Sequence, residues 1–176
     1  MDFCRAAISN VLLMEGGLVN DPNDPGGLTK FGISKKAYPD IDIANLTVEQ
    51  ATEIYRKEWA EVLGDALPPP LALLVFDHAV NAGRSRSVRI LQAVSEAGID
   101  GVMGPQTVEA AKFYYARRGA DALRFFTERR LSYYRSIDGW EHFAAGWIKR
   151  SLFMLVTAVQ WDCAITSLRV NGAVTS

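Results

Sequence analysis

The feature that most constrains this sequence is a proline- and glycine-rich segment, residues 15–33, which interrupts an otherwise helical pattern. Its letters are EGGLVNDPNDPGGLTKFGI, with two Asn-Asp-Pro triplets before a pair of glycines. Proline cannot continue a helix, and aspartate and glycine favour turns. The segment therefore predicts a loop in which residues 28–33 form a short strand or a small hairpin.

Helical patterns lie on both sides of this loop. Apolar residues from Phe3 to Met14 recur at helical spacing, and Gly16 is expected to end that helix. Residues 47–50 fit a capping box that opens a helix through Trp59. Prolines 68–70 are expected to break the chain before the later helices. Those helices are expected at residues 71–81, 87–97, 105–118, 120–137 and 141–168. The predicted fold class is all-α, with a minor β-hairpin or loop excursion.

Length and charge narrow the possible classes of protein. A chain of 176 residues suits one compact domain, or one domain with a closely packed extension. The turn at residues 99–104 is the expected seam, so residues 1–98 and 99–176 are predicted as two parts packed in one compact monomer. A formal net charge of −1 argues against nucleic acid as the main partner, because phosphate binding usually needs a basic surface.

Cysteine and histidine are too scarce to indicate a metal site. The two cysteines, Cys4 and Cys163, are expected to be buried thiols, and a disulfide between them stays open as an alternative. The two histidines form no HExxH motif. We therefore predict no metal and no organic cofactor.

The sequence shows no targeting or membrane segment of the usual kind. Its first ten residues carry an acid at position 2 and lack a basic region followed by an apolar core, so no secretory signal is expected. The apolar run at residues 152–159 is much shorter than the ~20 residues that span a bilayer. We predict a buried core helix there, no stable membrane insertion, and synthesis in the cytoplasm.

Glu15 is the first candidate for chemistry. It lies in the last turn of the first predicted helix, where the negative end of the helix dipole disfavours a second negative charge. Desolvation by Met14 and Leu18 would raise its pKa further. A carboxylic acid that stays protonated near neutral pH can donate a proton to a leaving oxygen. The alternative is a solvated glutamate at a helix end, which residue type alone would favour.

Two aspartates follow Glu15 in the turn. A rigid turn can place Asp24 opposite Glu15 across a sugar, and glycoside hydrolysis requires two carboxylates arranged in this way. For Asp24 this role and simple capping of turn amides are about equally favoured, whereas Asp21 is expected to shape the turn. A calcium loop is disfavoured because Pro25 occupies the third ligand position of that pattern.

The whole segment resembles the signature of glycoside hydrolase family 108, the N-acetylmuramidases of phages and prophages, some of which are labelled secretion activators. The resemblance continues in FDHAVNAGRSRSVRILQAV, residues 76–94, and in DGVMGPQTVEA, residues 100–110. The last string is similar to the peptidoglycan-binding part that follows the catalytic part in the family. The likeness covers roughly residues 8–150.

The resemblance implies a lysozyme-like, mainly helical fold with Glu15 as the catalytic acid. There is also a looser likeness to phage-type lysozymes, in which Glu, Asp and Thr occur at fixed intervals. The Glu15–Asp24 interval fits that pattern, but the Asp24–Thr29 interval is one residue short. Leu18 also departs from the family, where an aromatic residue is frequent. The implied catalytic residues are Glu15, Asp24 and Thr29.

Further residues are candidates for contact with a sugar. Asn81 can hydrogen-bond an N-acetyl group, although a helix-capping role is at least as well supported. Tyr55 can stack on a sugar face, as can the tryptophans, yet aromatic residues at helical spacing usually belong to the core. Asp77 and His78 are expected to be buried polar residues. Three arginines, Arg84, Arg86 and Arg89, are expected to form a solvated surface.

The sequence thus predicts a muramidase that cuts the β-1,4 bond between N-acetylmuramic acid and N-acetylglucosamine in peptidoglycan. The alternative is a non-catalytic protein on the same fold that binds the wall or regulates secretion. Without a signal sequence, an enzyme of this kind would reach periplasmic peptidoglycan with help, for example through a pore made by a partner protein.

Overall fold

The computed structural model describes residues 1–15 and 28–174 of the chain. Within these ranges it contains seven α-helices, one short 3₁₀ helix and one two-stranded hairpin. The chain forms two compact units, Met1–Ala60 and Glu61–Ser176. The predicted division after residue 98 separates a catalytic from a wall-binding part and stays a prediction.

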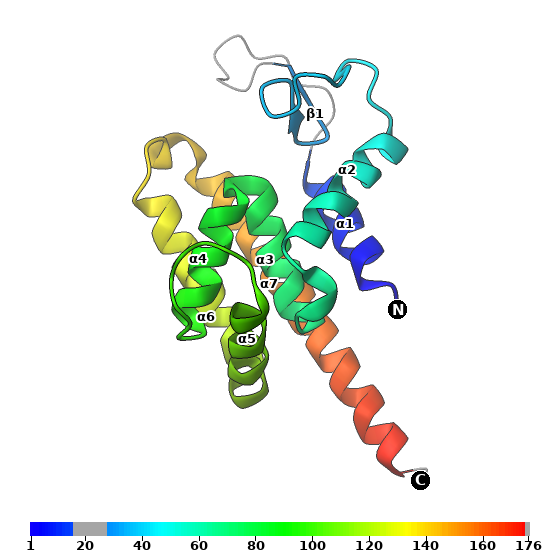
Figure 1. Cartoon of the computed structure of the whole chain (residues 1–176), viewed down its shortest axis with the longest axis vertical. Coiled ribbons are helices and arrows are strands. Elements are labelled where there is room, and N and C mark those ends of the chain that lie inside the picture. Colours follow the sequence, from blue (N-terminus) through cyan, green and yellow to red (C-terminus); the bar gives the residue numbers. More distant parts are fainter. Residues whose placement is uncertain (16–27, 175–176) are drawn as a thin grey trace. The chain divides into compact units, whose positions relative to one another are not determined.

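The first unit combines two helices with a hairpin (Figure 1). Helix α1 spans Phe3–Met14, strands β1 and β2 span Thr29–Lys30 and Ile33–Ser34, and helix α2 spans Val48–Glu61. The predicted first helix and hairpin are therefore confirmed. The predicted capping box is also present, because the Thr47 N–H donates to Gln50 Oε1 at 2.9 Å and the Gln50 N–H to Thr47 Oγ1 at 3.2 Å.

The second unit is built around α3, Pro69–Ala82, whose residues 70–79 are all buried. The short 3₁₀ helix η1, Gly64–Ala66, precedes it, and four helices follow it. These are α4 (Arg84–Val94), α5 (Pro105–Arg118), α6 (Ala120–Arg135) and α7 (Trp140–Val174). Helices α4, α6 and α7 contact α3, which gives the unit its core (Figure 1).

Two predicted helix starts in this unit need correction. Prolines 69 and 70 do not separate helices but form the first turn of α3, where the N–H that proline lacks would have no partner inside the helix. Helix α4 begins at Arg84 rather than at residue 87. Gly83, with φ +94°, allows the chain to turn directly from one helix into the next.

Helix α7 is only partly a core helix. Among the described residues, its segment Trp140–Leu168 is long and apolar enough to cross a membrane by length and composition. One face is buried in the fold, since Met154 and Ala158 have no exposed surface and α7 contacts α3 and α6. Leu152 and Val156 on the opposite side remain 49% and 56% exposed. The predicted burial of residues 152–159 therefore holds for one face only.

The cysteines differ from expectation. Neither forms a disulfide among the described residues, and Cys4 is half-buried whereas Cys163 is exposed. The interpretation of the pair as buried thiols is therefore wrong for Cys163, which lies on the exposed side of α7. The open alternative of a disulfide is not realised in this structure.

The turn that carries DGVMGP is held by one buried glutamine. Gln92 of α4 is 1% exposed, and its Oε1 accepts from the N–H groups of Asp100 and Gly101 at 3.1 and 2.9 Å. Its Nε2 donates to Asp100 Oδ1 at 2.7 Å and to Thr107 Oγ1 at 3.1 Å. The turn is thus fixed from inside before α5 begins at Pro105, which is a structural use for this string.

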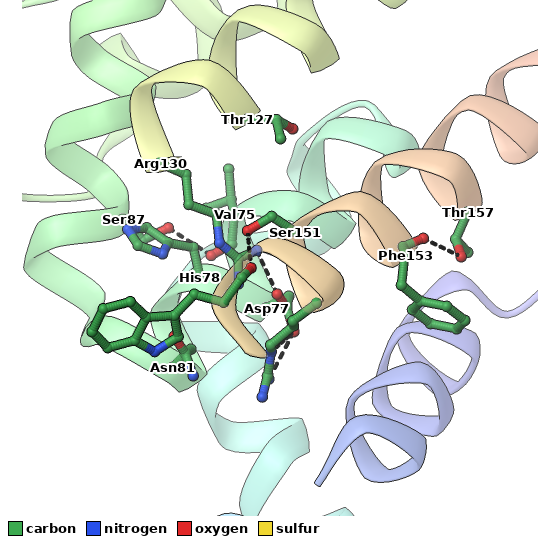
Figure 2. Close-up of polar contacts among 12 residues, drawn as sticks. Val75, Asp77, His78, Asn81, Ser87, Thr127, Arg130, Ser151, Phe153 and Thr157 are labelled. Atoms are coloured by element: carbon green, nitrogen blue, oxygen red, sulfur yellow. Dashed lines mark hydrogen bonds and ion pairs between the residues drawn. The ribbon is translucent and has the colours of Figure 1, made fainter. Parts of the chain in front are cut away.

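A buried ionic cluster joins three helices of the second unit (Figure 2). Asp77 of α3 has no exposed surface, and its two carboxylate oxygens pair with different arginines. Arg130 Nη1 of α6 is 2.5 Å from Oδ2, and Arg150 Nε of α7 is 2.8 Å from Oδ1. Burial alone would raise the pKa of Asp77, but the two guanidinium groups outweigh it and hold that pKa below its ordinary value.

His78 lies beside this cluster and is kept neutral. Its Nδ1 is 3.3 Å from the Tyr134 hydroxyl, which donates its own proton to Asn81 Oδ1. We infer that Nδ1 carries the proton of the neutral ring. Nε2 is buried without a hydrogen-bond partner among the described residues. Burial, and then the charge of Arg130, lower the pKa of His78 to about 3.

This shift predicts a dependence of stability on pH. An unfolded histidine has a pKa near 6.5, so between pH 6.5 and 3 the unfolded chain binds a proton that folded His78 does not. The contribution of neutral His78 to the free energy of unfolding is therefore fully present above pH 6.5 and is lost progressively as the pH falls. Urea unfolding should show a loss of roughly 1–2 kcal/mol between pH 6.5 and 5.

Histidine variants identify the residue responsible. The chain has only one other histidine, His142, which is exposed. His78→Gln should flatten the slope between pH 6.5 and 5, whereas His142→Gln should leave it unchanged. A slope that survives in His78→Gln would assign the effect to other groups.

Candidate active site

Glu15 ends helix α1. It is the C-cap residue, and its N–H donates to Val11 O at 2.9 Å, closing the last turn. Its side chain is half-buried. The residue thus has the position that the sequence predicted, at the carbonyl end of a helix dipole.

The hairpin that faces Glu15 has a tight two-residue turn. Lys30 pairs with Ile33, so Phe31 and Gly32 form the tip, with φ +54° and +76°. Two successive positive φ values are typical of the type I′ turns that suit twisted hairpins. Glycine adopts this conformation freely, but Phe31 is strained in it.

The carboxyl of Glu15 lies directly against Gly32. A Cβ atom added at Gly32 would be 2.4 Å from Glu15 Cδ and 2.5 Å from Glu15 Oε2, closer than real Cβ atoms approach. With the acid in this position only glycine fits, and any larger residue would have to push the Glu15 side chain aside. The hairpin tip therefore lies directly against the carboxyl, a contact that no local sequence pattern indicates.

Tyr55 of α2 supports the hairpin tip from behind. Its ring is 2% exposed, and its hydroxyl donates to Phe31 O at 2.6 Å. The Lys30 ammonium lies 5.6 Å from the centroid of the Phe31 ring. These contacts hold the strained residue next to Gly32. The structure gives Tyr55 a positioning contact, and its buried ring offers no open face for the predicted stacking on sugar.

Of the four remaining predicted site residues, the structure describes Thr29 and Asn81 but not Asp21 and Asp24. Thr29 is half-buried in β1 and pairs with Ser34 across the hairpin. Asp21 and Asp24 lie outside the described residues, so their relation to Glu15 stays a prediction. Asn81 belongs to the second unit, where it is exposed and its side-chain oxygen accepts the hydroxyl proton of Tyr134.

The described geometry suits proton transfer. A half-buried carboxyl held against a strained, hydrogen-bonded turn has a fixed place from which to donate a proton. Such preorganisation is needed for general acid catalysis, because the acid must meet one particular oxygen of the substrate.

Comparisons with known proteins agree with the family resemblance of residues 15–33. A sequence model of the family described as Glycosyl hydrolase 108 matches residues 8–83, which include Glu15 and the hairpin. The chain is similar to the solved structure of Brucella abortus SagA, with 28% identity and a TM-score of 0.81, over 90% of this chain and 95% of that one. No curated protein matches the chain.

The comparisons confirm two sequence-based predictions. The resemblance to glycoside hydrolase family 108 is confirmed over residues 8–83, and the fold is all-α and lysozyme-like. The match supports a lysozyme-like peptidoglycan hydrolase in general terms. The likeness of residues 100–110 to a peptidoglycan-binding part stays a prediction.

Proposed function

We propose that this chain is an N-acetylmuramidase that hydrolyses the β-1,4 bond between N-acetylmuramic acid and N-acetylglucosamine in peptidoglycan. The observation that carries the proposal is the fixed position of Glu15 against Gly32, within the segment that matches Glycosyl hydrolase 108. The sequence places two further carboxylates, Asp21 and Asp24, close behind in the chain.

In the proposed mechanism Glu15 protonates the leaving oxygen. Asp24 activates water or stabilises positive charge on the sugar ring, with Thr29 helping to hold that water, while Asp21 shapes the turn. Attack through a water needs carboxyl groups ~6.5–9.5 Å apart and inverts the anomeric centre, whereas ~5 Å would suit retention. We favour inversion because the Glu15–Asp24 interval is that of phage-type lysozymes.

The same proposal covers the oligomeric state of the enzyme, its substrate and its route to the cell wall. The enzyme would act as a monomer on glycan strands of periplasmic peptidoglycan, with no cofactor and without stable membrane insertion. A partner protein that makes a pore would release it from the cytoplasm. The C-terminal part would bind peptidoglycan.

The products of digestion test this proposal. Purified protein is incubated with peptidoglycan, and the new reducing ends are reduced with borohydride and identified. A muramidase leaves N-acetylmuramitol. N-acetylglucosaminitol would show cleavage of the other glycosidic bond, and new amino termini would show a peptidase or amidase. Pelleting with the wall without any cleavage would favour the non-catalytic alternative.

Gly32→Ala should disable the proposed acid. The new Cβ cannot share space with the Glu15 carboxyl, and the backbone at φ +76° adds strain of about 1–2 kcal/mol. We expect release of reducing ends to fall by at least about tenfold while the protein remains folded, because ~1 Å displacements of catalytic groups are costly. Activity and urea unfolding are measured on the same preparation.

Gly119→Ala is the matched control. Gly119 also has positive φ, +52°, but a Cβ there meets nothing within 4 Å. It should lose stability without losing activity per folded molecule. Equal activity losses in both variants would refute the argument that Gly32 positions Glu15.

A further inference from the structure

Aromatic side chains gather where α6 ends and α7 begins, in the second unit. The Trp147 ring stacks on Tyr134 with centroids 4.9 Å apart and planes at 13°. The ring centroids of Trp140 and Phe143 lie 6.3 and 5.7 Å from the Trp147 ring centroid, respectively. Phe143 is 60% exposed, and the two tryptophans are half-buried. We call Trp140, Phe143 and Trp147 the aromatic platform.

The backbone holds the platform in place. Gly139 precedes α7 with φ +88°, and a Cβ there would be 2.9 Å from Phe143 Cδ2 and 4.0 Å from the Trp147 ring. The Phe143 N–H donates to Gly139 O at 2.9 Å. The Phe143 ring and the edge of the Trp147 ring therefore lie over a glycine that leaves room for them.

The underside of the platform is anchored in the core. Tyr134, which supports Trp147, is 1% exposed. Its hydroxyl donates to Asn81 Oδ1 and accepts from Arg130 Nε at 3.1 Å. Asn81 and His78, three residues apart on α3, both contact the Tyr134 hydroxyl. Trp147 of the platform is thus connected through Tyr134 and Arg130 to the buried Asp77 cluster.

Polar groups accompany the rings. Asn81 is exposed, and because Tyr134 occupies its amide oxygen, its amide nitrogen is the group that it can offer to a ligand. Arg86 is also exposed, with its guanidinium 5.8 Å from the centroid of the Tyr133 ring next to Tyr134. The surface therefore combines flat apolar rings with a fixed amide donor and a guanidinium.

We propose that the aromatic platform, with Asn81, binds an N-acetylated sugar of a β-1,4 glycan strand. The rings would stack on the apolar face of the pyranose, and the Asn81 amide would donate to the acetamido carbonyl oxygen. This proposal rests on the proposed function for the choice of ligand. It places sugar binding on α3, α6 and α7, away from the DGVMGP turn to which the sequence resemblance assigned wall binding.

The combination of groups favours a sugar over other occupants. A second copy of the chain or a membrane surface would bury the exposed rings, but neither requires an amide held in one orientation by a buried tyrosine. A pyranose needs both a flat apolar contact and directed hydrogen bonds. Self-association and vesicle binding are therefore outcomes that would count against the proposal.

Binding of pentaacetylchitopentaose tests the platform, measured by calorimetry with the Glu15→Gln protein so that no cleavage occurs. Phe143→Ala and Trp140→Ala should each weaken binding about tenfold. Phe113→Ala is the matched control, because Phe113 of α5 is 64% exposed, much like Phe143, but lies outside the platform. Its ring is covered by the Arg117 guanidinium. This variant should change binding by less than about twofold.

Asn81→Asp tests the amide separately. The carboxylate can still accept from Tyr134, so the fold is preserved, but the N–H donor is lost. Pentaacetylchitopentaose should bind about tenfold more weakly to this variant. Cellopentaose, which has hydroxyls in place of acetamido groups, should bind weakly to the parent protein and equally weakly to the variant.

The outcomes separate this inference from the proposed function. Platform-dependent binding in a wild-type protein that cleaves no peptidoglycan would support the inference and refute the enzyme. Cleavage by wild type combined with undiminished binding in Phe143→Ala, Trp140→Ala and Asn81→Asp would refute the inference alone. Absence of binding to the chito-oligosaccharide, or platform variants that alter only self-association or vesicle binding, would also overturn it.

Discussion

Replacing Glu15 with glutamine should reduce the release of reducing ends from peptidoglycan by at least about a hundredfold, the usual contribution of a general acid. The amide has nearly the same shape, so it can lie against Gly32 as the carboxyl does. It has no acidic proton to give to the leaving oxygen. The loss should therefore appear in turnover, with the circular dichroism spectrum and the wall-pelleting behaviour unchanged.

A second glutamate on the same unit controls for the substitution itself. Glu53 of α2 is exposed and pairs with Arg56 at the surface, at 3.2 Å. Glu53→Gln should retain activity within about twofold, because exposed ion pairs contribute little. Wild-type activity in Glu15→Gln would remove Glu15 from the mechanism, whatever the family match.

The position of Glu15 was predictable because it depends on local pattern. A helical stripe, its end and the following turn residues are all contiguous in the sequence, and local rules apply to them. The contact with Gly32 was not predictable in the same way. It joins residues on opposite sides of the turn-rich segment, and no periodicity indicates which hairpin residue meets the acid.

Tyr55 illustrates a related limit. Aromatic residues at helical spacing usually belong to the core, and Tyr55 is indeed buried. Its hydroxyl partner is the backbone carbonyl of Phe31, 24 residues away. Backbone acceptors have no signature in the sequence, so a positioning role of this kind becomes visible only in the fold. The strained φ of Phe31 could likewise not be foreseen, because asparagine is the usual residue there.

Helix positions in the second unit were largely predictable, whereas the chemistry of its core was not. Proline at the first helical position, Pro105, predicted the start of α5, and the apolar run at residues 71–81 predicted α3. Asp77 was expected to be a buried polar residue, but its partners Arg130 and Arg150 lie 53 and 73 residues further along. Helix α6 carries three other arginines, and Arg150 directly follows Lys149 in α7, so the charge pattern does not indicate which basic residue meets Asp77.

Replacing Asp77 with asparagine should destabilise the protein by about 3–5 kcal/mol, the usual effect of removing one partner from a buried ion pair. The variant would leave two buried guanidinium groups facing a neutral amide, which can accept from only one of them through its oxygen. Urea unfolding at pH 7 measures the loss. Because the cluster supports Tyr134 beneath the aromatic platform, near-ultraviolet circular dichroism from the stacked rings should weaken as well.

A surface aspartate provides the matched control. Asp121 pairs with Arg124 at 3.2 Å on the exposed side of α6, so Asp121→Asn should cost less than about 1 kcal/mol. If Asp77→Asn does not fold, the triple variant Asp77→Leu, Arg130→Met, Arg150→Met keeps the question answerable. It removes all three charges together and should fold, because apolar replacements of a buried ionic cluster are often neutral or stabilising. A loss below about 1 kcal/mol in Asp77→Asn would mean that the carboxylate does not neutralise the two arginines.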